Sequence, residues 1–341
     1  MLMPRLYNED CVEGARRHIA DGTVDLILTD PPYGIGGDKL DKHYNRDESF
    51  VVGGYVEVPE GEYGEFSREW IGEAVRILRP GGSIYIVSGY TNLHHVLNAL
   101  HSTDLYEVNH LIWKYNFGVH TTKKYVSSHY HILFWQKPGG APTFNTYCRY
   151  GDSETGQNGS SLNYLDREDV FVINREYQPG EAKNKNELPW ELLSKLISYS
   201  SNPGDTVCDM FLGGFSTAIV AKGMGREPIG FEISKNAFDM GMERFLAVEE
   251  GEFLGRLRVP AKNRRVNGGK PWTDEERGIM AAILGTRPWE TKKDAIGAVC
   301  EALGRGKWGV ENEMKRLGLA VAKPLEAPSG PVSVQTTLDT R

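Results

Sequence analysis

The sequence is poor in cysteine, and the few cysteines it has are scattered. Four occur among 341 residues, and none stands in a Cys-x-x-Cys pair. Neither a disulfide framework nor a structural zinc site is therefore indicated. His94, His95, His129 and His131 also lack metal-ligand spacing with any Cys or Asp cluster. We therefore expect structural roles for these histidines and no metal site.

Long hydrophobic runs are lacking as well. No apolar run in the sequence approaches the ~20 residues that a helix needs to span a bilayer. Residues 1–10 carry charges where a signal peptide would have an apolar segment. We therefore expect a cytoplasmic protein with no membrane association.

A positive net charge is missing too. The formal net charge is −7, which argues mildly against a nucleic-acid-binding protein. The charge is uneven, however. Residues 256–316 hold fourteen Lys and Arg against eight Asp and Glu, a local charge of +6, which leaves −13 for the remainder. An acidic chain with a basic C-terminal part can still hold DNA locally.

Short apolar runs alternate with helical periodicity over residues 6–249. The expected strands are 24–29, 83–88, 108–114, 129–136, 206–211 and 227–231. The expected helices include 69–78, 94–100, 190–199 and one that starts near 217. This alternation predicts an α/β fold with a Rossmann-like, doubly wound, mostly parallel sheet. Residues 36–65 are predicted to form a loop or insertion, and residues 137–185 to lie outside the core sheet.

The strand expected over 24–29 ends at Asp30-Pro31-Pro32-Tyr33. A carboxylate at the carboxyl end of a parallel strand lies where α/β sheets bind their ligands. The prolines stiffen the loop and remove N–H donors beside the Asp30 and Pro31 carbonyls. A carboxylate and a carbonyl can together accept both protons of an –NH₂ group, and Tyr33 can stack on a planar base. The alternative is a strand that merely ends in a rigid turn.

A second candidate site follows the strand expected over 206–211. Gly213 and Gly214 allow close backbone approach, and a helix begins near Ser216-Thr217. Glu232 ends the next strand, 19 residues beyond Gly213, where a carboxylate can accept from ribose hydroxyls. The strict G-x-G-x-x-G pattern and a Walker lysine are both missing, so a nucleoside without phosphates fits better than a diphosphate. An ordinary glycine turn in a β-α-β unit is the alternative.

Together these two segments resemble the DNA N6-adenine/N4-cytosine amino-methyltransferases, in the β-class order where D-P-P-Y precedes the cofactor motif. The resemblance implies S-adenosylmethionine as cofactor, double-stranded DNA as substrate and attack by the amino group of a flipped base. It assigns catalysis to four residues: Asp30, Pro31, Pro32 and Tyr33. Adenine N6 is expected, because cytosine-N4 members, the alternative, more often carry Ser where Asp30 stands. The ring-carbon cytosine methylases are disfavoured, because no cysteine here follows a proline.

The resemblance also implies where the cofactor binds. Residues 209–213, D-M-F-L-G, are similar to the family's D-P-F-x-G, and residues 184–193 to its H-P-T-x-K-P-x-x-L-L. The implied cofactor-binding residues are Asp10, Asp30, Asn184, Asn186, Leu188, Asp209, Phe211, Gly213, Phe215, Ser216, Thr217 and Glu232. The chain departs from the pattern at Met210, at Phe215, which replaces a glycine, and at Leu188, which replaces a lysine. A DNA-binding protein with a decayed methyltransferase fold is therefore the alternative of another class.

The C-terminal part reads as a separate module. A methyltransferase domain over 1–258, with a target-recognition insertion at about 137–185, is followed by a linker over 259–270, helices over 271–320 and a disordered tail over 321–341. W-T-x-E-E at 272–276 and L-G-R at 303–305 are similar to Myb/SANT-like helix-turn-helix modules. The candidate DNA contacts are Lys307, Trp308 and Arg316, with Lys123 and Lys124 from a polar loop. A helical packing or dimerisation module is the alternative.

The resemblance further suggests a bacterial or phage-encoded protein that acts on host DNA. A homodimer and a cognate restriction endonuclease are the protein partners that it allows.

Overall fold

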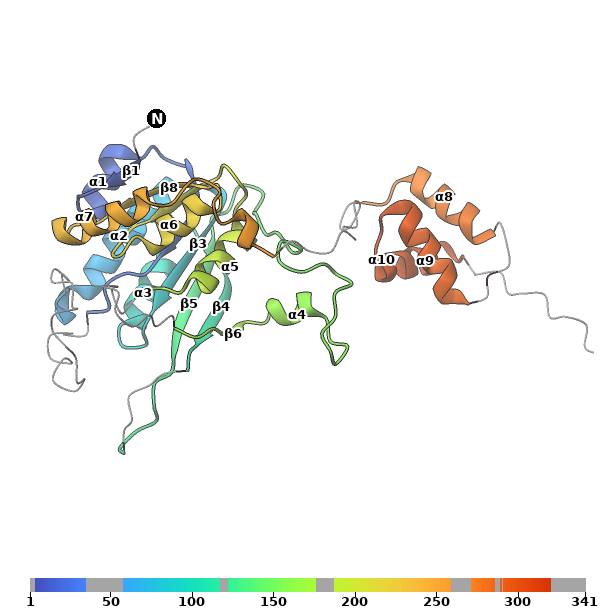
Figure 1. Ribbon diagram of the computed structural model, residues 1–341, viewed down its shortest axis with the longest axis horizontal. Helices are drawn as coiled ribbons and strands as arrows, with labels where there is room; N and C mark the ends of the chain where they lie inside the picture. The colour runs from blue at the N-terminus through green and yellow to red at the C-terminus, as the bar shows by residue number, and fades with distance from the viewer. Residues whose placement is uncertain are drawn as a thin grey trace, which may run out of the picture. The chain divides into compact units, whose positions relative to one another are not determined.

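The computed structural model describes residues 4–34, 58–116, 122–175, 187–258, 271–285, 289 and 291–319. The chain forms two compact units, Met1–Ala261 and Lys262–Arg341 (Figure 1). The boundary between them falls inside the segment expected to be a linker. No helix in the described ranges is long and apolar enough to cross a membrane.

An eight-stranded sheet forms the centre of the first unit, with the strand order β1-β8-β7-β2-β3-β5-β4-β6. The strands are β1 (Arg5–Tyr7), β2 (Val24–Thr29), β3 (Leu78–Ser88), β4 (Tyr106–Lys114), β5 (His129–Gln136), β6 (Val170–Val172), β7 (Thr206–Asp209) and β8 (Glu227–Phe231). β5 runs antiparallel to β3 and β4, and every other neighbouring pair is parallel. The mostly parallel α/β sheet expected from the sequence is confirmed.

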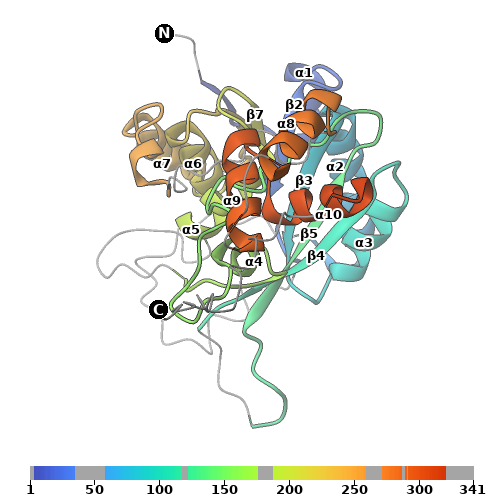
Figure 2. The ribbon, with the colours of Figure 1, turned by 90° about the vertical axis from the view of Figure 1, so that its right-hand side faces the viewer.

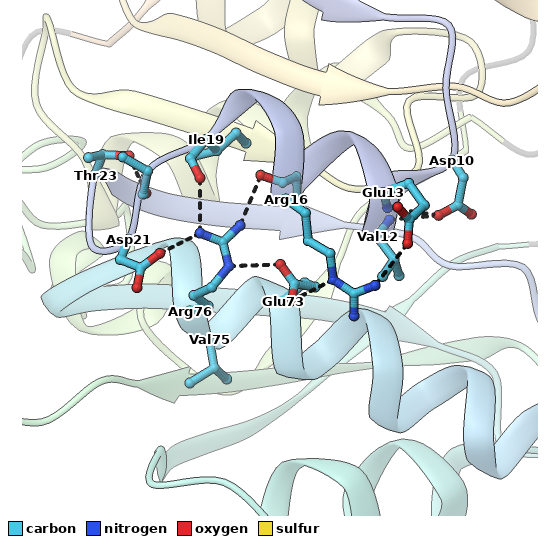
Figure 3. Close-up of polar contacts among 12 residues, drawn as sticks. Asp10, Val12, Glu13, Arg16, Ile19, Asp21, Thr23, Glu73, Val75 and Arg76 are labelled. Carbon is cyan, nitrogen blue, oxygen red and sulfur yellow. Dashed lines mark hydrogen bonds and ion pairs between the residues drawn. The ribbon is translucent and has the colours of Figure 1, made fainter.

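Helices cover both faces of this sheet (Figure 2). They are α1 (Cys11–His18), α2 (Tyr63–Ile77), α3 (Leu93–His101), α5 (Trp190–Ser200), α6 (Ser216–Gly223) and α7 (Lys235–Leu246). The unit also contains α4 (Leu162–Asp166), which stands apart from the sheet in Figure 1, and 3-10 turns at Glu60–Glu62 and Leu254–Arg256. Ile27 of β2 packs in one apolar cluster with α1, α2 and α3. Its neighbours Leu26 and Leu28 pack in another with α5 and α6. Because side chains alternate along a strand, one apolar run serves both layers.

The structure corrects three expectations about secondary structure. The segment 137–185 does contribute to the core sheet, because β6 pairs with β4 at the sheet edge. A three-residue edge strand with Val170 and Val172 exposed is too short to show periodicity. β3 begins at Leu78 instead of 83, although a proline and two glycines interrupt its first part. α2 begins at Tyr63, and the rest of the loop expected over 36–65 lies largely outside the described residues.

Figure 3 shows how α1 is held at both ends. The Asp10 carboxylate caps its N-terminus and accepts hydrogen bonds of 2.9 and 3.1 Å from two backbone N–H groups. Arg76 of α2 donates to the Ala15 and Ile19 carbonyls, both at 2.9 Å, and to Glu73 at 2.8 Å. A neighbouring helix thus binds carbonyl groups at the end of α1, which holds the segment between β1 and β2.

The second unit contains α8 (Asp274–Gly285), α9 (Lys292–Leu303) and α10 (Lys307–Leu317) around its own apolar core. A capping box begins α8: the Thr273 N–H donates to Glu276 at 2.9 Å, and the Glu276 N–H donates to the Thr273 hydroxyl at 3.2 Å. Arg305 is buried, pairs with Glu276 and lies 4.7 Å from the centre of the Trp272 ring. The W-T-x-E-E and L-G-R segments therefore meet in the fold. The tail expected over 321–341 lies outside the described residues.

Candidate active site at the carboxyl edge of the sheet

The two candidate segments lie side by side because β2 and β7 are parallel neighbours. Asp30 follows β2 directly, and Asp209 is the last residue of β7. The Thr29 hydroxyl donates to Asp209 Oδ1 at 2.8 Å and joins the two strand ends. The carboxyl ends of parallel strands are where such sheets bind ligands, so the structure brings both segments to one place.

The loop after β2 is held by its own carbonyl groups. The Tyr63 hydroxyl donates to the Pro32 carbonyl at 2.8 Å, and Asn92 Nδ2 donates to the Tyr33 carbonyl at 2.7 Å. Among the described residues, no donor bonds to the Pro31 carbonyl. Proline also leaves that stretch without N–H groups of its own. The loop thus places a carbonyl without a hydrogen-bond donor, on the buried residue Pro31, directly after Asp30 in the chain.

Asp30 is half-buried and sits among charged and hydroxyl groups. Burial raises the pKa of its carboxyl group to about 7, and the nearby Asp209 carboxylate acts in the same direction. A hydrogen bond from the Tyr33 hydroxyl to Oδ1 and the positive charge of Arg175 both lower this pKa. Asp30 is therefore close to the midpoint of its titration near neutral pH, as suits a group that accepts a proton.

Aromatic rings cluster next to Asp30. The ring centres of Tyr33 and Tyr130 lie 5.4 Å apart. Tyr130 in turn lies 5.6 Å from Trp113 and 5.5 Å from Tyr115. Tyr33 was predicted from its motif. The others were missed as site residues, although two aromatics alternate at the end of β4 and one stands at the start of β5.

The glycine turn after β7 departs from its expected form at Phe215. This residue has φ = 67°, the one positive φ of a non-glycine residue in the described part of the chain. Its side chain is fully buried in a small cluster with Leu212 and Phe245 and packs against Phe238 at 5.4 Å. The ring of Phe215, one of the implied cofactor-binding residues, therefore lies in the core, and only the backbone of this residue remains for a ligand.

Asp209 and Thr217 also turn inward. Asp209 is 4% exposed and accepts from Thr29, from the Phe211 N–H at 3.0 Å and from Thr217. Burial raises the pKa of Asp209 to about 6, while these hydrogen bonds lower it. The Asp209 and Thr217 side chains thus build the turn. Phe211 stays partly exposed and packs edge-on against Trp70 at 5.3 Å.

Glu232 lies at the carboxyl end of β8, beside the turn. Its Oε2 accepts from the Gly213 N–H at 2.9 Å, and its Oε1 from the Ser234 N–H at 2.7 Å. Burial raises the pKa of this carboxyl group, and the two hydrogen bonds oppose that shift. Each carboxylate oxygen has capacity for a further hydrogen bond. Glu232 can therefore still accept from ribose hydroxyls, so the turn fits a nucleoside.

An ion pair that the sequence did not reveal closes the turn from the other side. Arg244 of α7 donates to Glu187 at 2.6 and 2.9 Å and to the Gly214 carbonyl at 2.8 Å. Glu187 also accepts from the Ser216 hydroxyl at 2.9 Å. A Cβ atom at Gly214 would lie 2.1 Å from the Glu187 carboxylate. A side chain at this position would displace Glu187 from its ion pair with Arg244, and no periodic signal in the sequence could have indicated this contact.

The other residues predicted for the cofactor site are less central. Asp10 is exposed and caps α1, whereas Leu188 is buried in the core with α5. Asn184 and Asn186 lie outside the described residues. No group of three or more His, Cys, Asp or Glu residues in the described ranges is arranged to hold a metal.

The residues predicted to contact DNA are on the surface. Lys123 and Lys124 are exposed before β5, and Lys307 and Trp308 are exposed at the start of α10, with Trp308 77% accessible. Arg316 is exposed as well, but it is paired with Glu313 at 2.6 Å.

Known proteins resemble this chain in sequence and in fold. The pattern of the DNA methylase family, which covers N6 and N4 enzymes, matches residues 24–243. The Type II methyltransferase M.HpaI of Haemophilus parainfluenzae is 30% identical over 74% of this chain and 76% of its own. The DNA adenine methyltransferase YhdJ of Escherichia coli K12 is 30% identical over 65% of this chain and 76% of its own. The structure of TTHA0409, a DNA modification methylase of Thermus thermophilus solved with S-adenosyl-L-methionine, shares the fold with a TM-score of 0.52. The match covers 73% of this chain and 99% of that chain, with 22% sequence identity.

Proposed function

The chain belongs to the DNA methylase family that covers N6 and N4 enzymes, and from that premise we propose that it is a site-specific adenine methyltransferase. Its substrate would be double-stranded DNA and its target the N6 amino group. S-adenosylmethionine is the cofactor of the family. The observation that carries the proposal is the acceptor pair formed by the Asp30 carboxylate and the Pro31 carbonyl, which no donor among the described residues occupies, next to the glycine turn.

The proposed mechanism starts with the base leaving the duplex, because its amino group is paired inside the stack. Asp30 and the Pro31 carbonyl then accept the two amino protons and direct the nitrogen lone pair away from themselves. Tyr33 stacks on the base, and its present hydrogen bond to Asp30 is replaced by one from the amino group. When bound, S-adenosylmethionine supplies an electrophilic methyl group on its sulfonium. Asp30 would take the proton that the nitrogen loses as the new N–C bond forms and the bond from sulfur to the methyl group breaks, which leaves the cofactor as a neutral thioether. Positioning supplies most of the rate.

The cofactor is proposed to bind at the turn after β7. Glu232 would accept from the ribose hydroxyls, and the backbone at Gly213 and Phe215 would lie against the ligand. The partly exposed Phe211 ring is available for an apolar contact with the adenine. Asp209, Ser216 and Thr217 would act through the hydrogen bonds that shape the turn.

Adenine is proposed over cytosine on two grounds. The residue before the two prolines is aspartate, where N4 enzymes more often have serine, and the relative YhdJ is named an adenine methyltransferase. The test is to incubate unmethylated bacteriophage DNA with the protein and labelled S-adenosylmethionine and to separate the nucleosides. We expect label in N6-methyladenine. Label in N4-methylcytosine would overturn the base assignment while keeping the reaction, and no label in either would overturn the activity.

Binding of DNA is proposed to involve both units. Lys123 and Lys124 would meet phosphates near the site, and Lys307, Trp308 and Arg316 would do so from α10. The name of M.HpaI, a Type II methyltransferase, supports a role in restriction-modification in a bacterial cytoplasm. A cognate endonuclease and a homodimer are further proposals. Size measurement in solution tests the second of these.

A further inference from the structure

The sheet topology collects residues from four strands beside Asp30. β6 is parallel to β4, so Arg175 and Tyr115 both follow strands that end at the edge where β2 ends. β5 is antiparallel and therefore begins at this edge, where Tyr130 is its second residue. The Trp113 indole N–H donates to the Ile173 carbonyl at 2.8 Å, which fixes the chain two residues before Arg175. The position of Arg175 is thus set by the sheet itself.

Three aromatic rings surround the Arg175 guanidinium. Its central carbon lies 4.6 Å from the ring centre of Tyr115, 5.3 Å from that of Tyr130 and 5.9 Å from that of Trp113. Nη2 donates to the Tyr130 hydroxyl at 2.9 Å. Such contacts are attractive for a cation and are stronger where water is excluded. The side chain is therefore held in one place and not free to sweep through solvent.

The cage formed by Tyr115, Tyr130 and Trp113 contains no negative charge that would balance the guanidinium of Arg175. Nε of Arg175 is buried and makes no hydrogen bond among the described residues, and no carboxylate in the described ranges forms an ion pair with this guanidinium. A buried polar donor without a partner calls for an explanation. Asp30 adjoins this cage through Tyr33, whose ring centre lies 5.4 Å from that of Tyr130 and whose hydroxyl donates to Asp30 Oδ1, and the positive charge of Arg175 lowers the pKa of Asp30.

We propose that Arg175 is a positioning residue for methyl transfer: Tyr115 and Tyr130 hold its guanidinium beside Asp30, where it keeps that carboxylate charged and able to accept amino protons. The groups that act on Asp30 are Tyr33 on its own loop, Asp209 at the end of β7, Tyr130 on β5 and Arg175 after β6. Of these, Arg175 is the cation. A protonated Asp30 would be a donor and could not accept from the base. This inference rests on the proposed role of Asp30.

The sign of the effect follows from these groups. Burial raises the pKa of Asp30 to about 7, and Arg175 works against that rise. Removing the positive charge should raise the pKa further, so that Asp30 is ionised only at higher pH. An opposite charge within a few ångströms typically lowers a carboxyl pKa by about 1–3 units. The acidic limb of the activity profile should therefore move upward when Arg175 loses its charge.

The experiment measures kcat/KM for unmethylated bacteriophage DNA from about pH 5.5 to about pH 9, since this parameter reports the free enzyme. In Arg175→Gln, we expect the acidic limb to rise by about 1 pH unit, with about tenfold less activity below it. Arg175→Lys keeps the charge and is the matched control, with the limb within about 0.3 unit of wild type. A loss in Arg175→Gln by the same factor at every pH would show a merely structural role and overturn the proposal.

Two further measurements keep the result interpretable. Calorimetry measures the affinity for S-adenosylmethionine, which should stay within about twofold in both variants. Arg175 lies far from the glycine turn in the sequence, and none of the contacts described for it involves a residue of that turn. If Arg175→Gln does not fold, Tyr115→Leu removes one wall of the cage and should move the limb in the same direction. An unmoved limb in Tyr115→Leu would then count against the proposal. If the proposed role of Asp30 itself is wrong, Asp30→Ala would remain active. That result is distinguishable from a failure of the proposal for Arg175.

Discussion

The Thr29 hydroxyl donates to the buried carboxylate of Asp209 at 2.8 Å, across 180 residues of sequence. Thr29 is the last residue before the loop with Asp30, and Asp209 is the last residue before the glycine turn. Together with the pairing of β2 and β7, this bond sets the distance between the group proposed to hold the base and the turn proposed to hold the methyl donor. Both side chains are fully or almost fully buried, so water cannot replace the bond if it is broken.

Removing this hydroxyl should destabilise the first unit. Thr29→Val leaves a buried acceptor with one donor fewer, a change that costs about 1–3 kcal/mol. Thr23→Val is the matched control, because the Thr23 hydroxyl bonds to a carbonyl at an exposed position. It should cost within about 0.5 kcal/mol. Urea unfolding of both variants measures the difference, and equal stabilities would show that the Thr29 bond contributes little.

Asp30→Ala should abolish methylation and leave S-adenosylmethionine binding largely intact. The reason is that the side chain is assigned to the amino group of the base, whereas Glu232 and the turn are assigned to the cofactor. Transfer of label to bacteriophage DNA measures the activity, and calorimetry measures the binding. Activity of Asp30→Ala within about tenfold of wild type would remove Asp30 from the catalytic role.

Glu232→Ala should weaken S-adenosylmethionine binding by about ten- to a hundredfold. A carboxylate that accepts from hydroxyls makes charge-assisted bonds worth roughly 1.5–3 kcal/mol each. Glu227→Ala is the matched control, because Glu227 is exposed at the opposite end of the same strand. Calorimetric dissociation constants for the two variants give the comparison. An unchanged value for Glu232→Ala would place the cofactor elsewhere on the sheet edge.

The role of the second unit can be tested without changing the net charge. Residues 271–341 hold ten Lys and Arg against ten Asp and Glu, while residues 256–270 hold six basic residues and no acidic one. The excess positive charge thus lies ahead of the helices. Deleting 271–341 should still lower DNA affinity if α10 touches phosphates. The log–log salt dependence of binding should also flatten, by about 0.9 in slope for each phosphate that is no longer neutralised.

A second truncation separates the two contributions. Deleting 259–341 also removes four basic residues of the expected linker, so the slope should flatten further. Both truncated proteins should fold and bind S-adenosylmethionine, because the eight strands end at Phe231. A shorter chain that ends at residue 270 and keeps the affinity and salt slope of the full protein would show that the helices pack or dimerise and do not bind DNA.

The sequence predicted those parts of the fold in which local pattern and tertiary role agree. β2, β5 and β8 have the bounds that their apolar runs indicated, because a buried strand is apolar along most of its length. β6 was missed, because it is three residues long and its pairing partner is remote in sequence. Arg175 was missed for the same reason, since only the pairing of β6 with β4 brings it to the site.

The residues of the candidate site likewise fall into those placed by a local pattern and those placed by a tertiary contact. Asp30 and Glu232 stand directly at strand ends, so a strand prediction was enough to place them. Phe215 could not be placed, because the direction of its ring depends on a residue of α7 that lies 26 positions later. A Cβ atom at Gly241 would be 2.2 Å from that ring. No local rule relates the two positions.

The side chain that fits at position 215 consequently depends on the one at position 241, and the reverse also holds. A ring at 215 requires the absence of a side chain at 241, while a return to glycine at 215 would relieve the positive φ and leave a void beside 241. A larger residue at 241 would fill that void but would clash with phenylalanine. Each single exchange therefore passes through a poorly packed intermediate, and the pair is expected to switch together. The phenylalanine that stands where the family pattern has glycine is thus accommodated within the core by the missing side chain at Gly241.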